Sequence, residues 1–140
     1  MLSKDSSLPM RIGYTPGCWD VFHSGHALFL RNAAQLCDGL VVGVASDSVI
    51  EIDKGQKPAC TLSDRMIVLQ AIRWVAVAAP YYRLEFITHL QLFRPDVLFV
   101  GQDWGHQQRH IDAETYMANK QVIKLPYTQG ISSSQLRSYI

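Results

Sequence analysis

Short apolar segments alternate with amphipathic segments along this chain, and this alternation limits the possible folds more than any other feature. The clearest segment, residues 40–45, is a continuous apolar run of the kind expected for a strand buried on both faces. Strands are also predicted at residues 10–14, 75–79, 97–100 and 121–125, and helices at 27–36, 61–74, 84–93, 112–120 and 132–140. Such alternation requires a parallel sheet with right-handed crossovers. We therefore expect an α/β fold, a Rossmann-like, doubly wound, mainly parallel sheet of about five strands with helices on both faces.

Length and charge narrow the class of protein. The chain has 140 residues, which suits a single domain over residues 10–140 after a polar tail, residues 1–9, that we expect to be disordered. With 48% hydrophobic residues the chain can bury a normal core. Its net charge of +1 gives no general attraction to nucleic acid, so any anion-binding site must be local.

Cysteine usage and hydropathy indicate a cytoplasmic protein. No apolar run approaches the ~20 residues that cross a bilayer, and no signal-peptide pattern opens the chain, so we expect no membrane association. The 3 cysteines, Cys18, Cys37 and Cys60, are odd in number and scattered, which predicts free thiols. Cys18 is expected to act through its backbone N–H rather than its thiol.

The stretch from Gly17 to His26, GCWDVFHSGH, lies between the first predicted strand and the first predicted helix. Ser24 or Gly25 is expected to cap that helix, which places His23 just before it and His26 in its first turn. A helix start offers unpaired backbone N–H groups and the positive end of the dipole, which together favour an anion. Because Gly17 and Gly25 allow close approach of the backbone, we interpret the stretch as a polyphosphate site with two imidazoles.

Other interpretations of these histidines were weighed. Paired histidines also bind metals, and they arise by chance. The chain contains no P-loop motif, no G-x-G-x-x-G and no G-x-S-x-G. His106 and His110 lie four residues apart, but a solvated loop is favoured there over a metal pair. Asp20 is expected to fix its loop through backbone N–H groups rather than to bind metal.

Several other polar segments also follow predicted strands, and the carboxyl ends of parallel strands meet at one edge of a sheet, where ligands bind. They are Ser46–Asp47, Gly101–Trp104 and Thr128–Ser133. Residues 49–60 are predicted to form an irregular loop carrying Lys54 and Lys57, either simply solvated or acting as a cationic lid. Arg65 lies in the first turn of the helix that Thr61 caps. A cation there indicates an anionic ligand, or pairing with Asp64.

The chain resembles the nucleotidyltransferases that carry a His-x-Gly-His motif. Residues 17–26 are similar to the G-x-F-D-x-x-H-x-G-H pattern of cytidylyltransferases, with Trp19 in the Phe position. Residues 128–133, TQGISS, resemble the second family motif, R-T-x-G-I-S-T, with Tyr127 in place of the arginine. Residues 101–104, GQDW, are similar to the G-D-D-W of glycerol-3-phosphate cytidylyltransferases.

The resemblance implies a Rossmann-like, usually dimeric enzyme, here expected to be a homodimer. Such an enzyme transfers a nucleotidyl group to a phosphorylated small molecule and releases pyrophosphate. It uses Mg²⁺ held mainly by the nucleotide phosphates, with no metal ligands among the side chains. The first expectation is CTP and an acceptor like glycerol 3-phosphate. The alternatives are an adenylyltransferase using ATP on a sugar phosphate or flavin precursor, and a catalytically idle nucleotide-binding module.

The resemblance also implies roles for particular residues. His23 and His26 would hold the triphosphate and stabilise charge in the transition state, and Lys54, or else Lys57, would contact both substrates. Lys54, Lys57 and Arg65 are the candidates for binding the acceptor phosphate. The nucleotide would be bound by Gly17, Cys18, Trp19, His23, Gly25, His26, Gln102, Asp103, Trp104, Thr128, Gly130, Ile131, Ser132 and Ser133.

Overall fold

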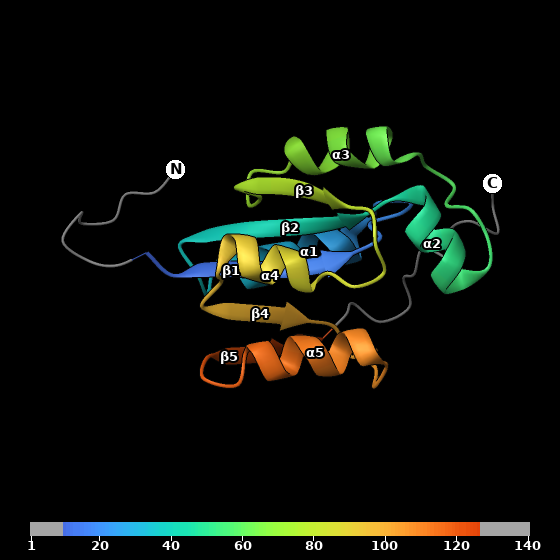
Figure 1. Cartoon of the computed structure of the whole chain (residues 1–140). Helices are drawn as coiled ribbons and strands as arrows, with labels where there is room; N and C mark the ends of the chain where they lie inside the picture. The colour runs from blue at the N-terminus through green and yellow to red at the C-terminus, as the bar shows by residue number, and fades with distance from the viewer. Residues whose placement is uncertain (1–9, 127–140) are drawn as a thin grey trace.

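A five-stranded parallel sheet forms the centre of the molecule (Figure 1). The computed structural model describes residues 10–126. The sheet has the order β3-β2-β1-β4-β5. Its strands are β1 (Ile12–Gly17), β2 (Gly39–Ala45), β3 (Val77–Tyr81), β4 (Val97–Val100) and β5 (Gln121–Lys124). The helices are α1 (Ser24–Ala34), α2 (Asp47–Lys54), α3 (Leu62–Gln70), α4 (Ile87–Phe93) and α5 (Gln108–Tyr116). The predicted fold class is confirmed.

The two faces of the sheet are buried against different helices. In Figure 1, α4 and α5 lie in front of the sheet and α1 lies behind it. Successive residues of β2 alternate between these faces, because side chains along a strand point to opposite sides. Val42 and Val44 pack with Leu30 of α1, whereas Val41 packs with Leu90 of α4. Every residue of β2 is buried, as its unbroken apolar sequence predicts.

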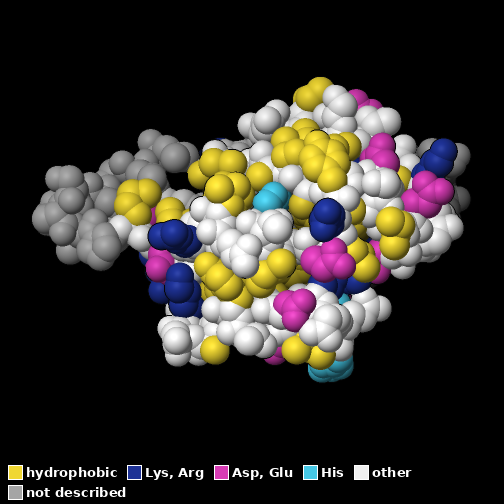
Figure 2. Space-filling view, in the orientation of Figure 1, with side chains coloured by type: hydrophobic (Ala, Val, Ile, Leu, Met, Phe, Trp, Pro, Cys, Tyr) yellow, Lys and Arg dark blue, Asp and Glu magenta, His cyan; other side chains and the backbone are white. Residues whose placement is uncertain are grey.

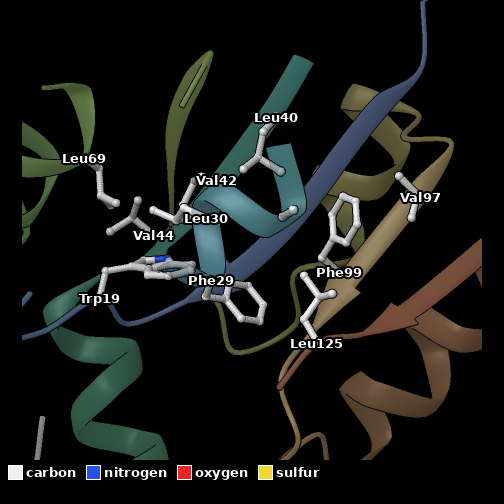
Figure 3. Close-up of a cluster of buried hydrophobic side chains, with 11 residues drawn as sticks. Trp19, Phe29, Leu30, Leu40, Val42, Val44, Leu69, Val97, Phe99 and Leu125 are labelled. Carbon is white, nitrogen blue, oxygen red and sulfur yellow. The ribbon is translucent and has the colours of Figure 1, made fainter. Parts of the chain in front are cut away.

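The core behind the sheet reaches the loop after β1. Figure 3 shows Trp19 at one end of this cluster, near Val44 and Phe29. The indole is 7% exposed, so the loop that precedes α1 is anchored in the hydrophobic core. The position of the first predicted motif is therefore tied to the packing of β2 and α1.

The segment 49–60 was predicted to be an irregular loop, and its first part is instead helix α2. Ser46 caps this helix, with its Oγ accepting a hydrogen bond from the Val49 N–H at 3.3 Å. Gly55 ends it in the left-handed conformation, with φ 76°. A serine before the helix and a glycine after it are normal boundary signals, and Val49 and Ile50 supply its buried face. These signals were present in the sequence.

Other predicted boundaries differ by a few residues. Thr15, Pro16 and Gly17 were predicted as a turn but continue β1. Strand β3 includes Pro80, which was predicted to end it. Proline is tolerated there because β3 is an edge strand that pairs only with β2. The predicted helix 112–120 begins earlier, at Gln108. The predicted helix 132–140 and the predicted tail 1–9 lie outside the described residues.

The sheet order contains a topological switch point between β1 and β4. Strands β2 and β3 follow β1 on one side, and β4 and β5 lie on its other side. The connections therefore diverge between β1 and β4, and ligands bind at the carboxyl ends of strands at such a switch point. The loop before α1 and the loop after β4 both leave the sheet there.

Charged side chains form no single patch on the face shown in Figure 2. Lysine and arginine side chains are scattered among acidic and uncharged ones rather than gathered into one basic patch. Within residues 10–126, no helix combines the length and apolar character needed to span a bilayer.

Candidate active site

A pocket of about 980 Å³ opens at the carboxyl ends of β1, β2 and β4. The loop from Gly17 to His26 forms one part of its wall, and residues 100–107 form another. Helices α2 and α5 and the segment between β3 and α4 complete it. The strand-end loops at 17–26 and 101–104 are thus brought together, as their positions after parallel strands predict.

The two histidines of the first motif together form the N-terminal cap of helix α1. His23, not Ser24 or Gly25, is the N-cap residue, and its Nδ1 accepts a hydrogen bond from the Gly25 N–H at 3.0 Å. His26 Nδ1 accepts in turn from the His23 N–H at 3.2 Å. The ring centroids lie 4.0 Å apart. This is the reciprocal geometry of a capping box, built here from imidazoles in place of a hydroxyl and a carboxylate.

This capping fixes the tautomer of both rings. A nitrogen that accepts a hydrogen bond carries no proton, so the proton of each neutral imidazole resides on Nε2. Burial lowers the pKa of His23, and burial together with the nearby His23 lowers the pKa of His26 to about 4. At neutral pH the site therefore offers two neutral Nε2–H donors beside a helix N-terminus, which suits phosphate oxygens.

The loop before the histidines follows an unusual backbone path. Trp19 and Val21 both have positive φ, 58° and 48°, a conformation that non-glycine residues rarely adopt. The Trp19 indole N–H donates to the Gly43 carbonyl at 2.9 Å. A Cβ on Gly17 would lie 2.9 Å from the indole ring, so glycine is needed at position 17 to let Trp19 fold back. The Trp19 side chain is thus part of the loop's support.

Asp20 holds a second loop against the first. Its carboxylate accepts hydrogen bonds from the Ala59 and Cys60 N–H groups at 2.8 and 2.9 Å. The prediction that Asp20 acts through backbone N–H groups is confirmed.

Arg65 is buried beneath the pocket and does not line it. Its guanidinium donates to the carbonyls of Cys18, Ala45 and Cys60, at 2.6–3.0 Å, and to the Asp47 carboxylate at 2.7 Å. The expected role in binding the acceptor phosphate does not fit this placement, because internal acceptors occupy the guanidinium. Neither does pairing with Asp64. Arg65 instead joins the ends of β1 and β2 to the start of α3.

Of the two candidate lysines, only Lys54 reaches the pocket lining. It is the last residue of α2, whereas Lys57 is exposed on the following segment, outside the lining residues. Burial raises the pKa of the Cys18 thiol, and the neighbouring Lys54 ammonium counteracts part of that rise by charge and hydrogen bonding. The Lys54 charge also lowers the pKa of His26, after the larger effects of burial and His23.

The loop after β4 contributes the other predicted pocket residues. Gln102, Asp103 and Trp104 all line the pocket. The Trp104 ring packs edge-on against His110 with centroids 4.3 Å apart. His110 Nδ1 accepts from the Gln107 N–H at the start of α5. Within residues 10–126, no group of three or more His, Cys, Asp or Glu side chains is arranged to hold a metal ion.

Several residues that line the pocket were not predicted from the sequence. They are Asp53, Tyr81, Leu84, Phe86 and Arg109, which come from α2, the end of β3, the segment before α4, and α5. The boundary signals Ser46 and Gly55 would have placed Asp53 in the last turn of a helix that follows β2. The sequence holds no local signal for Tyr81 or Arg109, because only tertiary packing brings them to this edge of the sheet. Thr128, Gly130, Ile131, Ser132 and Ser133 lie outside the described residues.

Fold and site together define a protein of the doubly wound α/β class, with a helix start and two imidazole donors at its switch point, an arrangement that suits a phosphate ligand. The chain belongs to the cytidylyltransferase-like family, whose model matches residues 14–139. It is 36% identical over 132 residues to the FAD synthase of Pyrococcus horikoshii, an alignment that covers 90% of this chain and 85% of that protein. It is also 35% identical over 130 residues to the bifunctional protein HldE of Photorhabdus laumondii.

The match to HldE covers 90% of this chain but 27% of HldE, so the chain spans about a quarter of that relative. Solved structures agree on the fold. The lipopolysaccharide core biosynthesis protein of Thermoplasma volcanium superposes with a TM-score of 0.71 at 22% identity, covering 86% of this chain and 98% of that one. The pantoate-beta-alanine ligase of Francisella tularensis superposes with a TM-score of 0.65 at 16% identity, covering 96% of this chain and 67% of the ligase.

Proposed function

We propose that the protein is an adenylyltransferase that moves AMP from ATP to a phosphorylated small molecule and releases pyrophosphate. The observation that carries this proposal is the pair of backbone-held, neutral imidazoles at the helix start, in a chain of the cytidylyltransferase-like family. ATP is favoured over CTP because the FAD synthase relative matches most of its own length, and FAD is a flavin phosphate carrying an adenylyl group.

The reaction suits the residues of the pocket. An oxygen of the acceptor phosphate attacks the α-phosphorus of ATP. The bond to the bridging oxygen of the β-phosphate breaks, and pyrophosphate leaves with that electron pair. No covalent enzyme intermediate is required, so the protein positions two polyanions and offsets developing charge. The Nε2–H groups of His23 and His26 and the Lys54 ammonium are the donors that would do this.

Mg²⁺ would enter with the nucleotide, because this ion keeps several waters and commonly binds through substrate phosphates. The described residues offer donors for phosphate rather than a carboxylate cage for a metal, which fits that mode. Here the metal would supply charge neutralisation on the phosphates. Two carboxylates of the pocket already have hydrogen-bond partners in the structure. Backbone N–H groups donate to Asp20, and the Arg109 guanidinium donates to Asp53.

CTP as the nucleotide is the second candidate. It is favoured by Gly101–Trp104, which resemble the G-D-D-W of glycerol-3-phosphate cytidylyltransferases and lie in the pocket wall. Tyr127 replaces the arginine of the second motif, which removes a cation and keeps a catalytically idle nucleotide-binding module as a further alternative.

The experiment is a parallel assay of pyrophosphate release with ATP or CTP. Each nucleotide is supplied with Mg²⁺ and with flavin mononucleotide, a mixture of sugar phosphates, or glycerol 3-phosphate. The proposal predicts turnover with ATP and one phosphorylated acceptor. Turnover with CTP alone would assign the cytidylyl reaction. A rise in Tm with either nucleotide but no turnover with any acceptor would identify the idle module.

A further inference from the structure

Two residues that line the pocket form an ion pair to which the proposed reaction assigns no role. Arg109 Nη2 donates to Asp53 Oδ1 at 3.0 Å, and the two side chains are 14% and 27% exposed. Arg109 is on α5, which follows β4, and Asp53 is on α2, which follows β2. Because β1 lies between β2 and β4, the pair spans the carboxyl end of β1, where the phosphate-binding histidines begin.

Besides the histidines, the pocket lining contains charged side chains of both signs, among them Lys54, Asp53 and Arg109. Lys54 is next to Asp53 on α2 and is close enough to His26 to lower the pKa of that ring, behind burial and His23. Arg109 lies near Tyr81. Burial raises the pKa of the Tyr81 phenol, and the Arg109 guanidinium opposes that rise. Lys54 on α2 and Arg109 on α5 are thus two cations in the lining of one pocket, and Asp53, next to Lys54 in sequence, pairs with Arg109.

A purely structural role explains this pair poorly. Both members of the pair line the pocket, so the ion pair borders the space that a ligand would occupy. The guanidinium also lines a pocket built for polyanions, and its planar fork binds phosphate in a bidentate manner. A carboxylate on the same group is a competitor that a phosphate dianion can replace.

We propose that Arg109 is a specificity-determining residue that binds the phosphate of the acceptor, taking it in exchange for the Asp53 carboxylate, with Lys54 as the second cation. The inference rests on the proposed function and names the acceptor's recognition element. Asp53 keeps Arg109 extended over β1 in the free protein. The acceptor class is a phosphomonoester dianion. The matching unphosphorylated alcohol is rejected because it offers no anion to replace Asp53 on Arg109 and none to pair with Lys54.

Two single substitutions separate this role from bracing of α2 against α5. Arg109→Met and Asp53→Asn both break the ion pair, so a brace predicts the same effect from each. A phosphate site predicts that only Arg109→Met weakens binding, because the first substitution removes the phosphate ligand and the second removes its competitor. The probe is inorganic phosphate, titrated calorimetrically into protein saturated with α,β-methylene-ATP, which occupies the nucleotide subsite.

We expect Arg109→Met to weaken phosphate binding roughly 10-fold or more, the size expected for one charge-assisted hydrogen bond. Asp53→Asn should leave the phosphate Kd unchanged or lower it. Arg109→Lys should retain part of the binding, and Arg73→Met, which removes an exposed cation outside the pocket lining, should have no effect. Melting temperatures of all four variants identify any that fail to fold.

Three results would overturn the inference. They are equal weakening by Arg109→Met and Asp53→Asn, no weakening by Arg109→Met, and no phosphate binding by the unmodified protein at millimolar concentration. Failure of the proposed function gives a different result, namely no binding of α,β-methylene-ATP. In that event, phosphate titrated without nucleotide still compares the two substitutions, and weakening by Arg109→Met but not by Asp53→Asn would retain Arg109 as a phosphate ligand.

Discussion

The two ends of the pocket are built in different ways. At the histidine end, the contacts that orient His23 and His26 are backbone hydrogen bonds within a few residues of sequence. At the other end, Asp53, Tyr81 and Arg109 come from separate elements and are held by side-chain contacts. The first arrangement pre-forms neutral donors before any ligand arrives. The second keeps charges that can exchange partners. This difference fits the proposal that nucleotide phosphates bind at the first end and the acceptor at the second.

The largest expected effect on stability comes from Arg65, whose buried guanidinium joins the ends of β1 and β2 to the start of α3. Arg65→Met should lower the free energy of unfolding by about 3 kcal/mol, because it leaves buried carbonyls of Cys18 and Ala45 without their donor. Urea denaturation measures this loss. Arg73→Met removes an exposed cation and is the matched control. A change within ~0.5 kcal/mol for both variants would show that Arg65 does not hold the loops together.

The histidine end can be tested without destroying the helix cap. His26→Gln keeps an N3 side chain able to accept from the His23 N–H but removes the imidazole donor. We expect turnover to fall on the order of 100-fold with Tm close to that of the unmodified protein. His26→Ala should lower both turnover and Tm. If His26→Gln retained full activity, capping would be the only function of that ring.

Gly43 tests the support beneath the same end. A Cβ at position 43 would collide with the Tyr14 hydroxyl and would lie 2.8 Å from Tyr14 Cζ. Tyr14 also donates to His89 at 2.7 Å. Gly43→Ala should therefore cost about 2 kcal/mol of unfolding free energy. Tyr14→Phe combined with Gly43→Ala should cost less than the sum of the single changes, because the colliding hydroxyl is gone. Strict additivity in thermal or urea unfolding would contradict the clash.

Most of the fold and the histidine end were predictable because their signals are local. The apolar run of β2 and the paired histidines before α1 can be recognised in short windows of sequence, and the structure places both as expected apart from the cap residue. Helix α2 was missed although Ser46 and Gly55 mark its ends. Arg65 was misassigned because its position in a first turn does not show that it points inward.

The end of the pocket formed by Asp53, Tyr81 and Arg109 could not be predicted from any short stretch of sequence. Arg109 and Asp53 are 56 residues apart and meet only because α2 and α5 flank β1. Tyr81 reaches the pocket because β3 ends beside β2 at this edge. Local sequence patterns carry no information on such pairs, whereas the sheet order determines them directly.

The pH dependence of stability tests the histidine end of the pocket separately. Because the pKa of His26 falls from 6.5 in the unfolded chain to about 4 in the folded one, the unfolded state binds more protons between those values. The stabilisation is present above pH 6.5 and is lost as pH falls toward 4, by on the order of 3 kcal/mol. His26→Gln should flatten this slope. An unchanged slope in urea denaturation at stepped pH would assign the titration to other groups.

The central claim is that two neutral imidazoles with protons on Nε2 hold the nucleotide phosphates. Nitrogen-15 NMR of labelled histidines, followed during titration with Mg-ATP, tests it most directly. We predict that His23 and His26 show the Nε2–H tautomer at pH 7 in the free protein. ATP should shift both Nε2 resonances and raise both pKa values, because phosphate favours the charged ring. Charged rings in the free protein, or no response of either ring to saturating ATP, would contradict the account.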